Sequence, residues 1–142
     1  AGLRLGWCLC SDTALVQRLQ AAAQPWSVHG PAQAAGIAAL QDDESPQRVR
    51  ALLRTPRPRM AAALQALGMR VVPGQANYLL FYCRQPLSEG LQALGVSIRS
   101  CENYPGLGPG WYRTAVRTEP ENNALLAALA KVLKGQNEDP QE

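Results

Sequence analysis

The 142-residue sequence is poor in the side chains that most often build catalytic and metal sites. It has a single histidine, His29, and only two lysines, Lys131 and Lys134, both near the C-terminal end. None of the four cysteines forms a C-x-x-C pair, so no metal site is expected. Cys8 and Cys10 share one face of a predicted strand, where reduced thiols behave as small apolar side chains.

Long apolar runs are also missing, and no run approaches the ~20 residues of a membrane-spanning helix. No signal-peptide pattern opens the sequence, so a cytoplasmic protein without a membrane partner is expected. The net charge of +3 is small and the basic residues are scattered, which argues against a nucleic-acid partner. The densest basic group, Arg54, Arg57 and Arg59, is interpreted as the solvated start of a helix.

The order of apolar periodicities and turn signals predicts strands and helices in mixed order. Helices are expected near residues 12–24, 31–40, 46–54, 56–67, 86–94 and 119–134, and strands at 1–10, 69–72, 76–83, 96–99 and 111–118. Ser45 and Thr55 are the expected caps of the third and fourth helices, and residues 76–83 the central antiparallel strand. We therefore expect an α/β fold of the α+β sandwich type, with a small antiparallel or mixed sheet covered by helices.

Two arginines near the end of the chain stand out because of their positions on predicted strands. Alternation places Arg99 on the face opposite Val96 and Ile98, and Arg113 on one face of the strand at 111–118. A turn-rich loop, residues 103–110, joins the two strands. A guanidinium stays charged and is buried only with an anionic partner, so the pair could clamp an anion. Two solvated strand arginines are the alternative, and the spacing leaves both open.

The same stretch carries a family resemblance. The motif IR-x-C-x-NYPGL, then YR-x-A-V-R-T and a helix opened by PEN, resembles the C-terminal domain of fold-type I pyridoxal-phosphate enzymes, the class I/II aminotransferase superfamily. Within it, the sequence looks most like the threonine-phosphate decarboxylases and next like the histidinol-phosphate aminotransferases. The resemblance implies that residues 1–44 end the large cofactor-binding domain, that 45–134 form the small C-terminal domain and that 135–142 are a polar tail.

The resemblance also implies roles for particular residues. The segment G-L-R-L-G at residues 2–6 resembles the one in which an arginine, here Arg4, binds the phosphate of pyridoxal 5'-phosphate. Arg99 and Arg113, with Arg117 as a further candidate, would hold the anionic groups of a phosphorylated amino-acid substrate. The Schiff-base lysine would lie upstream of Ala1. We therefore expect a fragment that holds no catalytic residue and is inactive alone.

Two further motifs resemble family segments. The run Q-P-W-S-V resembles a stretch that in the decarboxylases usually continues with asparagine, where this sequence has His29, and we expect that ring to bond the backbone. Asn77, in A-N-Y-L-L, resembles the asparagine of the family's A-N-F strand and is interpreted as a structural amide. Arg117 stands where the aminotransferase pattern tends to have glycine, which favours the decarboxylase.

Three hypotheses for function follow. The first is a decarboxylase of threonine phosphate that gives an aminopropanol phosphate for cobalamin-type cofactor synthesis, and the second is an aminotransferase of the histidinol-phosphate type. Both imply a homodimer as the full-length protein. The third is a stand-alone, non-catalytic anion-binding domain. If Arg99 and Arg113 clamp a substrate, they should line one open concavity and lack a partner among Glu102, Glu119 and Glu121.

Overall fold

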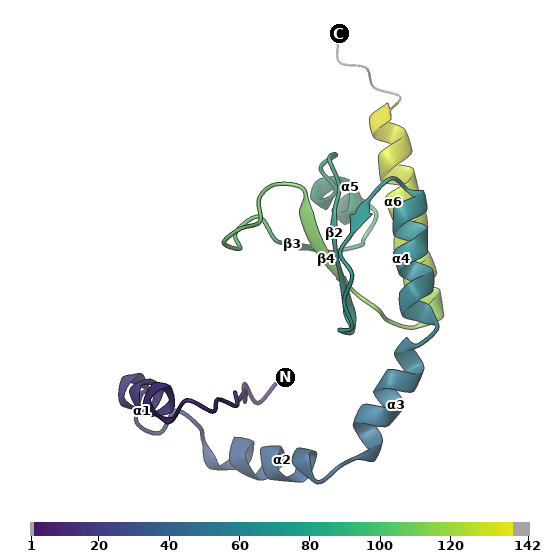
Figure 1. Ribbon diagram of the computed structural model, residues 1–142. Coiled ribbons are helices and arrows are strands. Elements are labelled where there is room, and N and C mark those ends of the chain that lie inside the picture. Colours follow the sequence, from purple (N-terminus) through teal and green to yellow (C-terminus); the bar gives the residue numbers. More distant parts are fainter. Residues whose placement is uncertain (1, 138–142) are drawn as a thin grey trace. The chain divides into compact units, whose positions relative to one another are not determined.

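The computed structural model describes residues 2–137 of the chain, which divide into two compact units. Of the described residues, those up to Arg48 form one unit and those from Val49 onward form the other. The boundary between them falls inside α3 (Glu44–Leu53), so a helix carries the chain from one unit to the next (Figure 1).

The first unit contains two capped helices, α1 (Thr13–Ala22) and α2 (Gly30–Leu40). Asp12 caps α1, because its Oδ1 accepts the backbone N–H of Leu15 at 3.1 Å. His29 caps α2 in the same way, since its Nδ1 accepts the N–H of Ala32 at 3.3 Å. The expectation that His29 bonds the backbone is therefore confirmed.

The strand predicted at residues 1–10 is wrong, because the structure assigns no strand between residues 2 and 10. A strand needs a neighbour for its backbone N–H and C=O groups, and the described part of the first unit offers no other strand. Leu5 instead lies against α2 at Gly36, where a Cβ atom would collide with the leucine side chain. Cys8 and Cys10 are exposed and do not share a buried strand face.

The second unit is a four-stranded antiparallel sheet with helices, as the sequence predicts. Its elements are α4 (Pro56–Ala66), β1 (Arg70–Val71), β2 (Tyr78–Tyr82), α5 (Ser88–Ala93), β3 (Arg99–Ser100), β4 (Trp111–Ala115) and α6 (Glu119–Asn137). The strand order is β1-β2-β4-β3, so β2 lies inside the sheet. The predicted fold class and the internal position of β2 are both confirmed.

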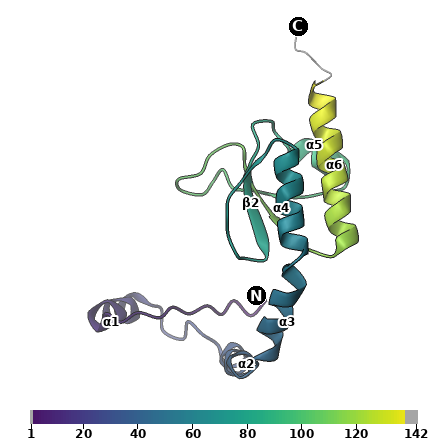
Figure 2. The same cartoon turned by 45° about the vertical axis from the view of Figure 1, so that its right-hand side comes forward.

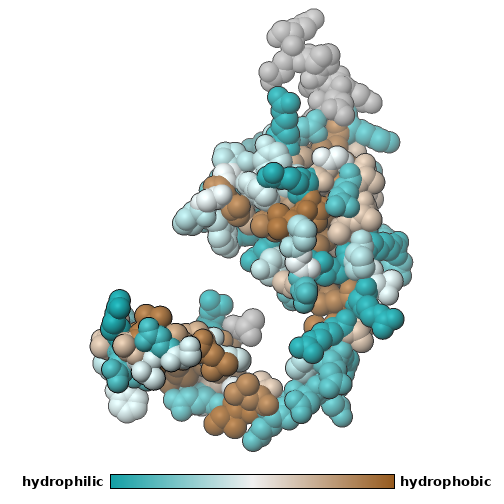
Figure 3. Space-filling model, in the orientation of Figure 1, coloured by the Kyte–Doolittle hydropathy of each residue, from teal (hydrophilic) through white to brown (hydrophobic). Residues whose placement is uncertain are grey.

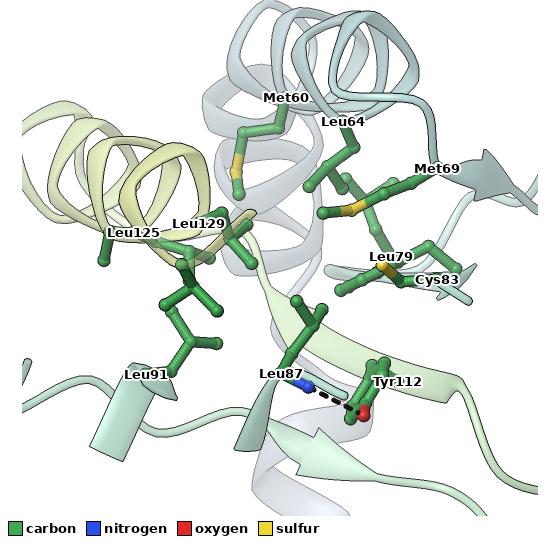
Figure 4. Close-up of a cluster of buried hydrophobic side chains, with 13 residues drawn as sticks. Met60, Leu64, Met69, Leu79, Cys83, Leu87, Leu91, Tyr112, Leu125 and Leu129 are labelled. Carbon is green, nitrogen blue, oxygen red and sulfur yellow. Dashed lines mark hydrogen bonds between the residues drawn. The ribbon is translucent and has the colours of Figure 1, made fainter. Parts of the chain in front are cut away.

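One face of the sheet carries the core. Phe81 of β2 and Tyr112 of β4 are paired in register and buried, with ring centroids 5.9 Å apart. Helices α4 and α6, which lie side by side in both ribbon views (Figure 2), add Met60, Leu64 and Leu129. These side chains gather in one apolar cluster (Figure 4). The sequence alternation in β2 and β4 thus turns one face of the sheet toward the core and the other face away from it.

The strands near the arginines are shorter than predicted. β3 starts only at Arg99, although Val96 and Ile98 still pack against the core as their alternation requires. β4 ends at Ala115, three residues earlier than expected. The chain leaves the sheet because the side chain of Asn122 bonds both the N–H and the C=O of Arg117, at 2.9 and 2.8 Å.

Two helix starts differ from prediction. Asp42, and not Ser45, caps α3, because its Oδ1 accepts the N–H groups of Glu44 and Ser45. Hydrogen bonds from the side chain and backbone of Ser45 lower the pKa of Asp42. Thr55 precedes α4 as expected, but its side chain makes no cap bond.

The C-terminal helix is longer than predicted. α6 runs through Asn137, so residues 135–137 are helical and not part of a tail, while the rest of the predicted tail, 138–142, lies outside the described residues. No helix among the described residues is both long and apolar enough to cross a membrane.

The basic group at the start of α4 is more than a solvated face. Arg57 Nε donates to the carbonyl of Ala76 at 3.0 Å, and Arg59 pairs with Glu119 and donates to Asn123. Arg54 and Arg59 are exposed, as a solvated helix start requires, while Arg57 is half-buried. Arg57 and Arg59 also connect α4 to segments distant in sequence.

The hydroxyl of Tyr112 makes a polar contact inside the core, and removing it measures how much that contact contributes to stability. It accepts the N–H of Leu87 at 3.1 Å within the buried cluster (Figure 4). Tyr112→Phe keeps the ring and leaves that N–H without a partner, so the free energy of unfolding should fall by about 1–3 kcal/mol. Urea unfolding followed by circular dichroism measures this. Tyr104→Phe, at an exposed tyrosine, is the matched control, and an equal effect of both changes would contradict the assignment.

Candidate functional site

The open face of the sheet in the second unit is lined by cations and aromatic rings. The register places Arg99 opposite Arg113, Arg113 opposite Leu80, and Arg70 opposite Tyr82. All these residues point away from the face that carries Phe81 and Tyr112, because alternate residues of a strand point to opposite sides. Three arginines on one small sheet face make it strongly electropositive.

Arg99 and Arg113 are Cα partners on neighbouring antiparallel strands. Like charges in directly opposite positions repel, so this pairing costs stability unless an anion lies between the guanidinium groups. Neither arginine has a carboxylate partner within residues 2–137. Two of the three glutamates considered as partners are engaged elsewhere, Glu119 with Arg59 and Glu121 with Arg117. Among the described residues, therefore, no ion pair with Glu102, Glu119 or Glu121 closes off Arg99 or Arg113.

Both arginines line one open cleft with a volume of about 490 Å³. Its walls come from the end of the β1–β2 loop, the approach to β3, and β4 with the residues that follow it. Arg113 is half-buried, and its guanidinium carbon lies 4.8 Å from the ring centroid of Tyr78. Arg99 is exposed. The cleft is therefore lined by two cations, of which Arg99 is the more exposed to solvent.

Arg117, the third candidate, also lines the cleft but has a counter-ion. Its Nη2 lies 2.7 Å from Oε1 of Glu121. That carboxylate also accepts the hydroxyl of Thr118 at 2.6 Å and its N–H at 3.2 Å. The hydrogen bonds from Thr118, and then the charge of Arg117, lower the pKa of Glu121 below its usual 4.5. Arg117 is consequently held at the start of α6 and is less available to a ligand than the other two arginines.

The loop before β4 sets the position of the strand that carries Arg113. Gly110 has a φ of +88°, and a Cβ there would lie 2.6 Å from the carbonyl oxygen of Cys83. Only glycine fits both the conformation and the close approach. The carbonyl of Gly110 accepts the N–H of Cys83 at 2.8 Å, so the loop is pinned to the end of β2. This contact places β4, and Arg113 with it, in register.

Arg4 belongs to the first unit. It lines a cavity of about 220 Å³ together with Ser27 and His29 at the start of α2. Its φ of 55° lies in the left-handed region, which costs a non-glycine residue about 1–2 kcal/mol. Such strained conformations cluster at functional sites. Arg4 is exposed and forms no ion pair with any residue that the structure describes.

The thiols and acids of the described residues form no recognisable centre of their own. Within residues 2–137 no group of three or more histidine, cysteine, aspartate and glutamate side chains could hold a metal ion. The four cysteines are free, with Cys8 and Cys10 exposed and Cys83 and Cys101 buried. Burial raises the pKa of the Cys83 thiol, which keeps it protonated and unreactive at neutral pH.

Sequence reasoning missed the aromatic partners of the arginines. Tyr78 stacks on Arg113, and Arg70 lies over Tyr82 at 5.5 Å and Trp111 at 4.9 Å. Alternation in 76–83 puts Tyr78 and Tyr82 on the face opposite Phe81, and this signal could have marked them as open-face residues. It could not have shown which arginine each ring meets, because that depends on strand register.

Comparison with known proteins places these features in a family. The model of aminotransferase class I and II matches residues 1–129. The threonine-phosphate decarboxylase of Salmonella typhimurium is 44% identical over 138 residues, which cover 94% of this chain and 38% of that protein. The histidinol-phosphate aminotransferase of Symbiobacterium thermophilum is 40% identical over 136 residues, with 94% and 37% covered. The chain thus spans little more than a third of the length of these relatives.

Solved structures agree on the fold. The histidinol-phosphate aminotransferase of Clostridium acetobutylicum superposes with a TM-score of 0.73 at 25% identity over 87% of this chain and 39% of that one. The L-threonine-O-3-phosphate decarboxylase of Porphyromonas gingivalis gives a TM-score of 0.67, and its 21% identity shows likeness of fold alone, over 87% and 40% of the two chains. Because the family model covers most of the sequence, the chain belongs to the class I and II aminotransferase family.

Proposed function

We propose that this chain is the C-terminal part of a pyridoxal-phosphate-dependent decarboxylase that acts on threonine phosphate. The observation that carries the proposal is the pair of arginines, Arg99 and Arg113, set directly opposite each other in an open cleft and without a carboxylate partner among residues 2–137. A ligand with two anionic groups relieves the repulsion between them. The 44% identity to a threonine-phosphate decarboxylase supports the same choice.

The chemistry of the first unit fits the phosphate of the cofactor. Arg4 is a permanently charged donor, and the hydroxyl of Ser27 lines the same cavity, so both could donate hydrogen bonds to phosphate oxygens. Pyridoxal phosphate, when bound, supplies the electron sink for cleavage of a bond at the substrate α-carbon. In this proposal residues 1–44 end the cofactor-binding domain and residues 45–134 form the small domain that holds the substrate.

The arginines would act by orientation. Threonine phosphate carries a carboxylate and a phosphate, and each can accept two parallel hydrogen bonds from a guanidinium. Fixing both anions decides which bond at the α-carbon stands where the cofactor can accept its electrons, and thus favours loss of carbon dioxide over transamination. The product, an aminopropanol phosphate, would be used in the synthesis of a cobalamin-type cofactor.

An aminotransferase acting on histidinol phosphate is the second candidate, supported by a relative at 40% identity. Histidinol phosphate has one anionic group where threonine phosphate has two, so it leaves one arginine without a partner. The complete enzyme should release carbon dioxide from O-phospho-L-threonine and should not transfer the amino group of histidinol phosphate to a 2-oxo acid. The opposite pattern of activities would replace the first candidate with the second.

The strength of the clamp can be measured at Arg113. In the complete enzyme, Arg113→Ala removes charge-assisted hydrogen bonds of roughly 1.5–3 kcal/mol each, so the dissociation constant for O-phospho-L-threonine should rise at least about tenfold per bond lost. Arg113→Lys should recover only part of this, because an ammonium keeps the charge and loses the planar fork. Arg48→Ala is the matched control, at an exposed arginine paired within α3. An unchanged affinity for O-phospho-L-threonine in both Arg113 variants would show that the substrate does not bind in this cleft.

The 142-residue chain by itself should be inactive. Its only lysines, Lys131 and Lys134, are exposed on α6 and line neither the arginine cleft nor the cavity of Arg4, whereas a Schiff-base lysine must be aimed at the cofactor aldehyde. We expect no saturable absorption band with pyridoxal phosphate and no turnover of O-phospho-L-threonine. A band that borohydride fixes stoichiometrically onto either lysine would contradict this, and tight cofactor-free binding of the substrate would support a stand-alone anion-binding domain.

The complete protein should be a homodimer, as the resemblance to fold-type I enzymes implies. Apolar side chains of the first unit are exposed, among them Leu9 at 88% and Leu40 at 69%, and Figure 3 shows hydrophobic surface over the segment with α1 and α2. Such surface is usually covered by other protein. Sedimentation of the complete protein at micromolar concentration should give twice the monomer mass, and a monomer would count against the proposal.

A further inference from the structure

We propose that Tyr78 is a positioning residue for Arg113, and that Arg113 is therefore the arginine that sets the direction of the bound anion while Arg99 adds charge. This inference rests on the proposed function of the cleft. It gives the two arginines different roles in anion binding, which their positions in the sequence do not distinguish.

The contact between Tyr78 and Arg113 can orient the guanidinium without competing with a ligand for its N–H groups. The guanidinium carbon lies 4.8 Å from the ring centroid, within the distance of a cation–π contact. A ring holds the flat face of a guanidinium and leaves the N–H groups along its edge free, whereas a carboxylate partner occupies those N–H groups. Arg117, which Glu121 holds, shows the second arrangement in the same cleft.

The backbone that carries Tyr78 is held at several points, while the residue itself is 40% exposed. It begins β2 opposite Ala115, and the residue before it, Asn77, accepts the N–H of Val116 at 2.9 Å. One residue further back, the carbonyl of Ala76 accepts Arg57 Nε at 3.0 Å. The loop that delivers the ring is thus tied to β4 and to α4. A ring on so well-anchored a backbone can limit the rotation of the guanidinium that it stacks on.

Arg113 and Arg99 differ in how firmly the surrounding structure holds their side chains. Arg113 is half-buried on β4, which pairs with β2 on one side and β3 on the other. Arg99 is exposed on the two-residue edge strand β3, and no described aromatic ring contacts it. An exposed side chain on an edge strand retains more rotamer freedom, which it loses on binding. Arg113 therefore loses less side-chain entropy than Arg99 when it forms directional hydrogen bonds to a ligand.

A double-mutant cycle in the complete enzyme tests the inference. Tyr78→Leu should raise the dissociation constant for O-phospho-L-threonine by about twofold to fivefold, the range expected for one partly exposed cation–π contact. The effect should persist in an Arg99→Ala background and vanish in an Arg113→Ala background, because the ring acts through Arg113. Tyr78→Phe retains the ring and should restore the affinity of the leucine variant. A full Tyr78→Leu effect in the Arg113→Ala background would overturn the proposal.

Tyr82→Leu is the matched control for this cycle. Tyr82 lies on the same strand and the same sheet face, but its ring meets Arg70 and Trp111. Its loss should lower stability and leave the dissociation constant unchanged. If Tyr82→Leu weakens binding as much as Tyr78→Leu, the effect belongs to the sheet as a whole, and Tyr78 has no special role.

A second measurement separates this inference from the proposed function. In the 142-residue chain labelled with ¹⁵N-arginine, the Nε–H signal that Arg113→Lys removes should be shifted upfield by the ring, and Tyr78→Leu should abolish that shift. This readout needs neither cofactor nor substrate. A shifted signal with an enzyme inactive on O-phospho-L-threonine would reject the function and keep the contact. An unshifted signal would reject the contact, whatever the activity.

Discussion

The repulsion between Arg99 and Arg113 is the constraint around which the second unit is arranged. Antiparallel pairing sets the two residues directly opposite each other, and two of the acids considered as their partners, Glu119 and Glu121, are paired elsewhere. Glu119 secures α4 to α6 through Arg59, and Glu121 holds Arg117. These ion pairs tie together elements of the second unit, while Arg99 and Arg113 line an open cleft without a carboxylate partner among residues 2–137.

The buried side of the same strands holds this unfavourable pair in place. Because strand residues alternate, a β4 that buries Tyr112 and Thr114 must turn Arg113 to the other face. A slip of one residue would bury the guanidinium and expose the tyrosine, so the apolar core fixes the register against the repulsion. The bond from the Leu87 N–H to the Tyr112 hydroxyl adds direction to this packing. The packing of the core and the position of Arg113 on the open face are consequently two results of one alternation.

Sequence periodicity predicted what depends on neighbours along the chain, and missed what depends on pairing. The sheet with its covering helices, the internal strand and the faces of Arg99 and Arg113 all follow from alternation and turn signals, and the structure agrees with each. The direct opposition of the arginines and the ring of Tyr78 depend on register, which alternation does not give. Residues 1–10 have strand-like composition, but the described part of their unit contains no strand for them to pair with, so composition alone misled.

The contrast between Arg113 and Arg117 shows why counting arginines on a strand could not identify the site. Both line the cleft and both stand two positions from Ala115, so the sequence treats them alike. Arg117 gives its N–H groups to Glu121, at the start of a helix that needs a capping carboxylate. Arg113 instead has its guanidinium carbon over the ring of Tyr78 and has no carboxylate partner among the described residues. The partner of a cation, rather than its position, separates a structural arginine from one free to bind.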